Sequence, residues 1–263
     1  MRLAIAGAGG KMGRTLIEAV ASDPDLELAA AFDLPDSPAV GTRVGAVAVG
    51  TDPAAAIAAA DALVDFTRPE GTMAHLEACL AAEKPIVIGT TGFSRAQRAR
   101  IEEAAARVPV MLSPNYAVGV NVAFRLAEIA ARALGDGWDV EIVEAHHRHK
   151  VDAPSGTALE LGRIVARALG RELEAVAVHG RRGETGARSS REIGFHAIRG
   201  GDIVGEHTVL FAGSGERVEI TVRSASRMSY ALGALRAAKW LRGRPPGLYD
   251  CFDALGLRQV APL

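Results

Sequence analysis

The opening of the chain constrains its fold more than any other feature, because a short apolar run there leads straight into a glycine-rich turn and a helical pattern. Arg2–Ala6 precedes GAGGKMG, residues 7–13, and apolar residues recur with helical spacing over Lys11–Ala21. Glycine permits the tight turn, the close approach of a phosphate to the backbone, and close packing of helix on strand. The first amides of the helix would face a pyrophosphate. Although the spacing departs from the strict GxGxxG pattern, this order predicts dinucleotide binding; the alternative is a merely tight turn.

An acid, Asp33, follows the second apolar run, twenty residues after Gly13. A carboxylate at this place binds both hydroxyls of an adenosine ribose and repels a 2′-phosphate. The next residue is Leu34, so the arginine that could bind a 2′-phosphate at this position is missing. Lys11 in the turn is a flexible cation that could bind a 2′-phosphate, but only weakly. We therefore expect use of both NADH and NADPH, with NADH preferred. The alternative for Asp33 is an ordinary solvent-facing acid.

Short apolar runs alternate with helical patterns over residues 1–117. This alternation predicts an α/β fold, a Rossmann-type doubly wound parallel sheet with helices on both faces. The expected strands are Arg2–Ala6, Glu27–Phe32, Ala62–Phe66, Pro85–Ile88 and Val108–Leu112, and the expected helices are Lys11–Ala21, Pro69–Ala82 and Ser94–Arg107.

From about Val118 the order changes, because helices come first and strands follow. This predicts a second, α+β domain with a mixed open sheet over residues 118–228. A last helix at Ser229–Leu241, with the tail to residue 263, would pack back on the first domain, residues 1–117. The polar stretch Arg181–Arg191 is expected to be a mobile loop. The other expected elements are helices Val120–Leu134 and Ser155–Leu169 and strands Val140–Ala145, Ile193–Ile198, Val204–Phe211 and Arg217–Arg223.

Most predicted strands of the first domain end in glycine or in a small polar cluster. In open α/β sheets, ligands bind outside the carboxyl ends of the strands. For Gly89–Gly92 the alternative is a simple strand-to-helix turn, and for Pro114-Asn115 it is a turn between domains. We expect four loops to line one crevice: Gly7–Gly10, Thr67–Pro69, Gly89–Gly92 and Ser113–Tyr116.

The densest group of reactive side chains lies at residues 144–157. It holds three of the seven histidines and Lys150, one of only four lysines beside 26 arginines. Lysine gives up a proton far more readily than arginine, so its presence here indicates chemistry. Adjacent histidines point in different directions, and no cysteine or HExxH spacing accompanies them, so we expect no metal.

An anion pocket with proton donors explains this segment best, and a solvated basic loop is the alternative. Histidine and lysine charges would lie beside a helix that Pro154 and Ser155 are suited to begin, with Ser155 as the N-cap. The amides of Gly156 and Thr157, with the Thr157 hydroxyl, would then bind a carboxylate.

Charge and cysteine content exclude several classes of function. Thirty cations and 31 anions leave a net charge of −1, so no long-range field attracts nucleic acid or an anionic membrane surface. No apolar run has the length of a membrane span or a signal peptide. Two cysteines are too few for a disulfide framework, so we expect a cytoplasmic protein. The balanced charge favours a small anionic molecule over a polymer as its substrate.

The string EAHHRHKVDAPSGTA, residues 144–158, closely resembles the hallmark segment of the 4-hydroxy-tetrahydrodipicolinate reductase family, also called dihydrodipicolinate reductase. The resemblance extends over nearly the whole chain. It includes the opening GAGGKMG and the strings DFTRPEG (65–71), GTTGF (89–93), SPNYAVGVN (113–121), GDIVGEHTV (201–209) and SRMSYALGALRAAKWL (226–241).

The resemblance implies hydride transfer from NAD(P)H that reduces 4-hydroxy-tetrahydrodipicolinate, through its dehydrated imine, to tetrahydrodipicolinate in diaminopimelate and lysine biosynthesis. It implies that His146 is a proton donor and acceptor, and that Lys150 is a proton donor. His147 would contact the cyclic imine dicarboxylate, and Gly156 and Thr157 would hold one of its carboxylates. Hydride addition to a conjugated imine builds negative charge, which nearby ammonium and imidazolium groups stabilise.

The resemblance also implies which residues bind the nucleotide and how the subunits assemble. It predicts a homotetramer formed through the sheet of the second domain. The nucleotide-binding residues that it implies are Gly7, Ala8, Gly9, Gly10, Lys11, Met12, Asp33, Gly89, Thr90, Thr91, Ser113, Pro114, Asn115 and Tyr116.

Two other functions compete with this one. Another Rossmann dehydrogenase of an amino-acid pathway would share the glycine turn but has no reason to carry HHRHK and PSGT. A nucleotide-sensing regulator without enzymatic activity would keep the first domain and tolerate the loss of His146 and Lys150. The remaining histidines, His75, His179, His196 and His207, are expected to pack in the core or on the surface, and Cys79 and Cys251 are expected to be inert thiols.

Overall fold

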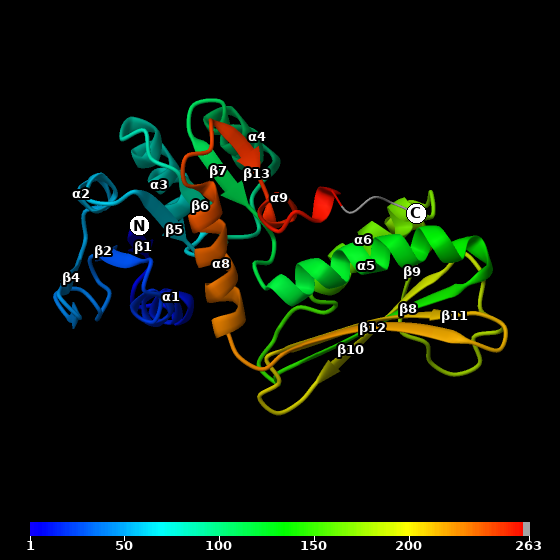
Figure 1. Cartoon of the computed structure of the whole chain (residues 1–263). Coiled ribbons are helices and arrows are strands. Elements are labelled where there is room, and N and C mark those ends of the chain that lie inside the picture. Colours follow the sequence, from blue (N-terminus) through cyan, green and yellow to red (C-terminus); the bar gives the residue numbers. More distant parts are fainter. Residues whose placement is uncertain (260–263) are drawn as a thin grey trace. The chain divides into compact units, whose positions relative to one another are not determined.

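A computed structural model describes residues 1–259, and the chain divides into two compact units (Figure 1). The first comprises Met1–Val118 and Arg227–Arg258, and the second comprises Gly119–Ser226 together with Gln259. Each unit is built on its own sheet. The C-terminal tail was expected to pack on the first domain. Its residues 260–263 lie outside the described residues.

The first unit contains an eight-stranded sheet in the order β13-β7-β6-β5-β1-β2-β4-β3. Every pairing is parallel except that of β3 with β4. The strands are β1 (Arg2–Ala6), β2 (Glu27–Phe32), β3 (Arg43–Val44), β4 (Val47–Gly50), β5 (Ala62–Asp65), β6 (Ile86–Ile88), β7 (Pro109–Leu112) and β13 (Gly247–Tyr249). The helices are α1 (Lys11–Ala21), α2 (Pro53–Ala58), α3 (Pro69–Ala81), α4 (Arg95–Ala105), α8 (Met228–Leu241) and α9 (Cys251–Ala254), followed by a 3₁₀ turn at Leu257–Gln259.

The central strands of this sheet are apolar on both faces because helices cover both. β5 and β6 are buried throughout. One core lies under α1 and α8 and includes Leu16 and Leu235, while the other lies under α2, α3 and α4 and includes Ile57 and Leu76. A parallel sheet covered on both faces confirms the predicted fold class.

The boundaries of the predicted elements in this unit lie within two residues of those observed, and α1 coincides with its prediction. The sequence did not predict β3, β4, α2, β13 or α9, because such short elements show no periodicity of their own. Across residues 1–259 the helices are all too short or too polar to span a membrane.

The second unit is an α+β structure whose five-stranded sheet has the order β12-β11-β8-β10-β9. β8 pairs parallel with β10 and antiparallel with β11, so the predicted mixed sheet is confirmed. The strands are β8 (Asp139–His146), β9 (Ala177–His179), β10 (Ile193–Arg199), β11 (Gly205–Ala212) and β12 (Arg217–Ser224). The helices are α5 (Val118–Leu134), α6 (Gly156–Ala168) and α7 (Leu173–Val176), with a 3₁₀ turn at Gly135–Gly137; α7 and β9 were not predicted.

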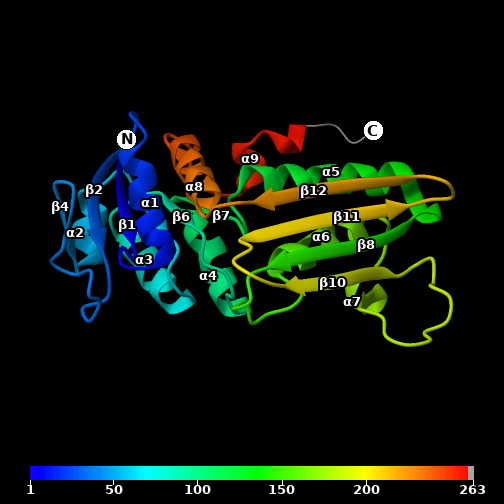
Figure 2. The same ribbon diagram turned by 90° about the horizontal axis from the view of Figure 1, so that it is seen from below.

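The two faces of this mixed sheet have different surroundings. Alternation along β8 places the buried side chains of Val140 and Ile142 on the face that α5 and α6 cover (Figure 1). Glu141 and Val143 lie on the opposite face. Figure 2 looks onto that face, with α5 and α6 behind the strands. The sheet is therefore open on one side within this unit.

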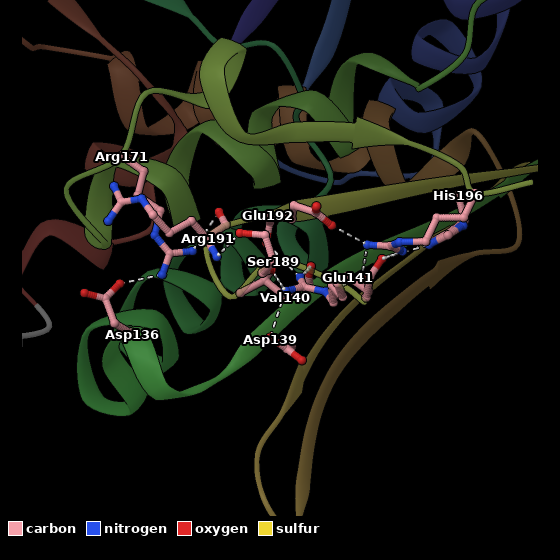
Figure 3. A network of polar contacts seen from close by, with 11 residues as sticks. Asp136, Asp139, Val140, Glu141, Arg171, Ser189, Arg191, Glu192 and His196 are labelled. Carbon is pink, nitrogen blue, oxygen red and sulfur yellow. Dashed lines mark hydrogen bonds and ion pairs between the residues drawn. The ribbon is translucent and has the colours of Figure 1, made fainter. Parts of the chain in front are cut away.

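The polar stretch Arg181–Arg191 contains no helix or strand, but two of its arginines bind Glu141 on the central strand β8 and Glu192 just before β10. Arg188 Nε donates to Glu141 at 2.9 Å, and Arg181 Nη2 lies 3.0 Å from both Glu141 and Glu192. Figure 3 shows the network around Glu141. The expectation of a mobile loop did not include these anchors, because they join residues that are far apart in the sequence.

Candidate active site

The turn after β1 requires glycine at two positions, for different reasons. Gly7 has a φ of +66°, a left-handed conformation that other residues rarely adopt. A Cβ on Gly13 would lie 2.0 Å from the Gly7 carbonyl oxygen, so only glycine allows α1 to pack this closely on the turn. The Gly10 amide donates to the same oxygen at 2.9 Å. The turn is therefore the compact strand–helix junction that a pyrophosphate site needs.

Asp33 follows β2, and its carboxylate is held against the glycine turn. The Gly9 amide donates to Oδ2 at 2.7 Å and the Leu34 amide donates to Oδ1 at 2.8 Å. A Cβ on Gly9 would lie 2.8 Å from Oδ2, so the approach of the acid depends on glycine. Each carboxylate oxygen has a further lone pair, which leaves capacity for the two hydroxyls of a ribose. These residues fit a dinucleotide.

A buried chain of polar groups lies at the carboxyl ends of β5 and β6. Asp65 is fully buried, accepts from the Thr67 amide at 2.8 Å and hydroxyl at 2.7 Å, and lies 2.8 Å from His75 Nδ1. The Thr72 hydroxyl donates to Thr90 Oγ1 at 2.8 Å and lies 3.5 Å from Thr67 Oγ1. The chain therefore fixes Thr90, a predicted nucleotide contact, and His75 packs as the partner of Asp65.

Close packing holds the loop after β6, and side-chain hydrogen bonds hold the loop after β7. A Cβ on Gly89 would lie 2.0 Å from the Phe66 ring, so the backbone passes close to that ring. The Ser113 hydroxyl accepts the Cys251 amide at 2.8 Å, and the buried Tyr116 donates its hydroxyl to the Ile88 carbonyl at 2.8 Å. The side chains of Ser113 and Tyr116 thus hold the fold. Of the remaining predicted contacts, Ala8 is buried, Met12 and Asn115 are partly exposed, and Lys11, Thr91 and Pro114 are exposed.

The predicted substrate residues of the second unit gather around Glu144, which lies on β8 two residues before His146 and is 1% exposed. Its Oε2 lies 2.6 Å from His146 Nδ1. Arg199 at the end of β10 donates one nitrogen to each carboxylate oxygen, both at 2.7 Å, and the Ser155 amide donates to Oε1 at 3.1 Å. One carboxylate therefore joins groups from β8, β10 and the start of α6.

Lys150 and His147 lie on the loop between β8 and α6. Lys150 Nζ donates to both carboxylate oxygens of Asp152, at 2.8 and 2.9 Å. Arg199 donates to the Asp152 carbonyl at 2.6 Å. Nδ1 of His147 is buried without a hydrogen-bond partner in the described chain. The loop is thus tied to the same arginine that binds Glu144.

α6 begins as the sequence predicts. Ser155 is the N-cap, its Oγ accepts an amide of the first turn at 3.2 Å, and Gly156 and Thr157 are the first two residues of the helix. Ser155 Oγ also lies 2.8 Å from Nε2 of His207, whose ring is 5.1 Å from the His146 ring in an edge-to-face arrangement. The helix N-terminus is therefore linked to the histidine at the end of β8.

Burial and charge set the protonation states of this site. Burial lowers the pKa of His146, although Glu144 acts against this shift. Burial by itself would raise the pKa of Glu144, but hydrogen bonds from Arg199 and His146 lower it overall. Burial lowers the pKa of His207 to about 4. At neutral pH Glu144 is ionised and His146 is neutral, so the hydrogen of His146 lies on Nδ1 and its lone pair on Nε2.

Three residues of this site were not predicted: Glu144, Arg199 and His207. Glu144 had a signal, since it is an acid on the face of β8 that also carries the apolar Val140 and Ile142. Arg199 and His207 had none, because 55 and 52 residues separate them from their partners. His207 was expected to pack in the core or on the surface, and it is buried, with 5% exposed. Within residues 1–259, no group of three or more His, Cys, Asp or Glu side chains is placed to hold a metal ion.

The first unit has a doubly wound sheet, a glycine turn and an acid placed to bind a ribose. The second unit carries a site with histidine and lysine. Together these features define an oxidoreductase that uses a pyridine nucleotide. The family model for the N-terminus of dihydrodipicolinate reductase matches residues 1–116, and that for its C-terminus matches residues 119–255. The chain belongs to the dihydrodipicolinate reductase family, as the sequence resemblance predicts.

Individual relatives agree with this assignment. The 4-hydroxy-tetrahydrodipicolinate reductase of Thiobacillus denitrificans is 60% identical, over 98% of this chain and 99% of the relative, and that of Dechloromonas aromatica is 58% identical, over 98% of each. The structure of a dipicolinate-bound dihydrodipicolinate reductase from Paenisporosarcina sp. TG-14 is 27% identical, with a TM-score of 0.79 over 96% of this chain and 98% of that one. A probable dehydrogenase from Thermotoga maritima, at 14% identity, shares the fold with a TM-score of 0.65 over 98% and 93% of the two chains.

Proposed function

We propose that this chain reduces 4-hydroxy-tetrahydrodipicolinate, through its dehydrated imine, to tetrahydrodipicolinate with NAD(P)H, in diaminopimelate and lysine biosynthesis. The observation that carries this proposal is that His146 and the start of α6 bind one buried carboxylate, whose partner Arg199 also binds the loop of Lys150. It occurs in a chain 60% identical to a reductase of that name. Proton donors beside a helix N-terminus suit an anionic substrate that takes up a proton during reduction.

His146 and Lys150 are the proposed catalytic residues. The substrate loses water and then gains one hydride and one proton. A reduced pyridine nucleotide supplies the hydride when it is bound. The Lys150 ammonium donates the proton and stabilises the negative charge that develops on the ring. His146 exchanges a proton at Nε2, because Glu144 occupies its Nδ1.

The start of α6 and His147 are proposed to bind the substrate. The amides of Gly156 and Thr157 open the helix, so its positive end favours a carboxylate there. The buried Nδ1 of His147, which has no partner in the described residues, is suited to a polar group of the substrate. A cyclic dicarboxylate therefore matches the chemistry of this end of the unit.

The glycine turn, Asp33 and the loops after β6 and β7 are proposed to bind the nucleotide. The tight turn supports this, as do the free acceptor capacity of the Asp33 carboxylate and the fixed Thr90. Dual use with NADH preferred is proposed because Leu34 offers no partner for a 2′-phosphate. The proposed contacts are Gly7, Ala8, Gly9, Gly10, Lys11, Met12, Asp33, Gly89, Thr90, Thr91, Ser113, Pro114, Asn115 and Tyr116, those of Ser113 and Tyr116 through their backbone.

A homotetramer in the cytoplasm is also proposed. The open face of the mixed sheet carries Ile198 with 52% of its surface exposed, and a second copy of the chain would cover it. Cys79 and Cys251 are both free and buried, which suits a reducing compartment. Light scattering of the purified chain would measure the subunit number.

The reductase activity is tested by mixing the purified chain with NADH and substrate made in place by a 4-hydroxy-tetrahydrodipicolinate synthase. We expect nicotinamide absorbance to fall only when the synthase and its substrates are present. A dehydrogenase of another pathway would need a different substrate. A nucleotide-sensing regulator would bind NADH without turnover, and either result would reject the proposal.

A further inference from the structure

One carboxylate joins the strand and the helix start that carry proposed site residues to Arg199 on a third segment, β10. Glu144 receives His146 from its own strand, Arg199 from β10 and the Ser155 amide from the start of α6, all between 2.6 and 3.1 Å. Its four hydrogen bonds use both oxygens. A fully buried carboxylate is unfavourable unless it is paired and hydrogen-bonded, and here Arg199 provides the pair.

We propose that Glu144, held by Arg199, is the positioning residue of the substrate site: it fixes His146 in the form with hydrogen on Nδ1 and holds the Lys150 loop and the start of α6 around it. The proposal rests on the proposed reductase function. It goes beyond that function because it names the groups that act through His146 and Lys150 without touching substrate.

The alternation of β8 shows that packing alone does not require an acid here. Val140, Ile142, Glu144 and His146 lie on one face of the strand, and the first two fill it with apolar side chains. A third apolar residue would continue that pattern. The ionised carboxylate instead accepts the Nδ1 hydrogen of His146, which leaves the lone pair on Nε2 for proton exchange.

The position of Lys150 depends on the same pair. Arg199 Nη2 donates to Glu144 and also to the Asp152 carbonyl at 2.6 Å. The Asp152 carboxylate in turn binds Lys150 Nζ at 2.8 and 2.9 Å. A change at Glu144 or Arg199 is therefore transmitted to both proposed catalytic residues.

The charged groups around His146 come from every neighbouring segment. Glu144 favours its protonated form, whereas Lys150 on the loop and Arg199 on β10 oppose it. His207 on β11 is neutral above about pH 5, because burial lowers its pKa to about 4. Loss of the Glu144 charge must therefore lower the pKa of His146 further.

The test replaces Glu144 by glutamine, which keeps the size of the side chain and removes its charge. We expect Glu144→Gln to lower kcat about 100-fold and to leave the Kd for NADH unchanged. Because the reaction is proposed to need neutral His146, kcat falls at acidic pH. This fall, the acid limb of the pH profile, should move to lower pH in the variant. The matched control is Glu128→Gln, since Glu128 on α5 is likewise an acid bound by arginine, in its case Arg125 and Arg132. We expect its kcat and pH profile to match wild type.

A second pair of variants keeps the proposal testable if Glu144→Gln does not fold. Arg199→Lys retains the charge and one hydrogen bond, whereas Arg199→Gln removes the charge. We expect Arg199→Lys to recover part of the kcat that Arg199→Gln loses. Equal losses in the two variants would mean that the charge on Arg199 does not support Glu144 in the way proposed.

The nitrogen chemical shifts of His146, measured by NMR, give a readout that does not depend on activity. We expect the wild-type ring to carry hydrogen on Nδ1 alone at neutral pH, and Glu144→Gln to shift the ring toward the other tautomer. An unchanged tautomer with an unchanged acid limb would overturn the proposal. If the wild type shows this tautomer but no reductase turnover, the proposed function fails while the positioning by Glu144 stands.

Discussion

Ser155 Oγ lies 2.8 Å from His207 Nε2, although 52 residues separate the two in the sequence. Ser155 caps α6, and His207 lies on β11 beside the ring of His146. This hydrogen bond therefore joins the N-terminus of the helix to β11 of the mixed sheet. Burial lowers the pKa of His207 to about 4, so His207 is uncharged at neutral pH in a site that already contains Lys150 and Arg199.

The first prediction concerns the pH dependence of stability. Burial lowers the folded-state pKa of His207 from 6.5 to about 4, so the unfolded chain binds the extra proton between these values. Stability from this group is complete above pH 6.5 and is lost as pH falls toward 4. The loss is about 3 kcal/mol. We expect His207→Gln to lack this part of the slope in urea unfolding measured from pH 4 to 7.

The control for that prediction is His149→Gln, which removes an exposed histidine from the same unit. Its free energy of unfolding should follow the wild-type pH dependence. A wild-type slope that persists in His207→Gln would show that another group takes up the proton.

The second prediction concerns the buried polar chain at the carboxyl ends of β5 and β6. Thr72→Val removes the hydroxyl that donates to Thr90 at 2.8 Å and changes the size of the side chain little. The Thr90 hydroxyl then loses this donor, which costs about 1–3 kcal/mol. Because Thr90 is a proposed nucleotide contact, its altered position should affect nucleotide binding. We expect weaker NADH binding in calorimetry and a kcat near wild type at saturating NADH.

Thr208→Val serves as its control, because the Thr208 hydroxyl pairs with Thr221 at 2.9 Å on the second unit. NADH should bind this variant with wild-type affinity. If Thr72→Val also binds NADH normally, the chain from Asp65 to Thr90 has no part in nucleotide binding.

The sequence predicted those parts of the fold whose signal is local. α1 shows helical spacing and β1 is a short apolar run, and both were predicted with their observed bounds. Ser155 was predicted as an N-cap from its residue type and its place after Pro154, and the structure confirms it. β13 was missed because its three residues show no period, whereas β6, which is equally short, was predicted because its residues form a continuous buried apolar run.

The site was predicted where residues are close in sequence and missed where they are not. His146, His147 and Lys150 lie within five residues, so their chemistry is visible in one string. Arg199 meets Glu144 only because β10 pairs with β8, and that register is set by the packing of the whole sheet. Pairings of this kind cannot be derived from one strand at a time.

The third prediction concerns the choice of nucleotide. Leu34 is 69% exposed directly after Asp33, so an arginine there has room to meet a 2′-phosphate. We expect wild type to prefer NADH in kcat/KM and Leu34→Arg to shift the preference toward NADPH. A tenfold advantage of NADPH in the wild type, about 1.4 kcal/mol, would contradict the assignment of Asp33 as the residue that sets the preference.

The most direct test of the account is the steady-state kcat for 4-hydroxy-tetrahydrodipicolinate, measured for wild type, His146→Gln, Lys150→Met and the double variant. Both side chains are proposed to exchange protons with the substrate, and neither belongs to the unit that carries the glycine turn. We expect substrate-dependent NADH oxidation by the wild type and a loss of about 10²–10⁴-fold in kcat in each single variant. The Kd for NADH should stay unchanged. Wild-type turnover by a folded double variant would contradict the account.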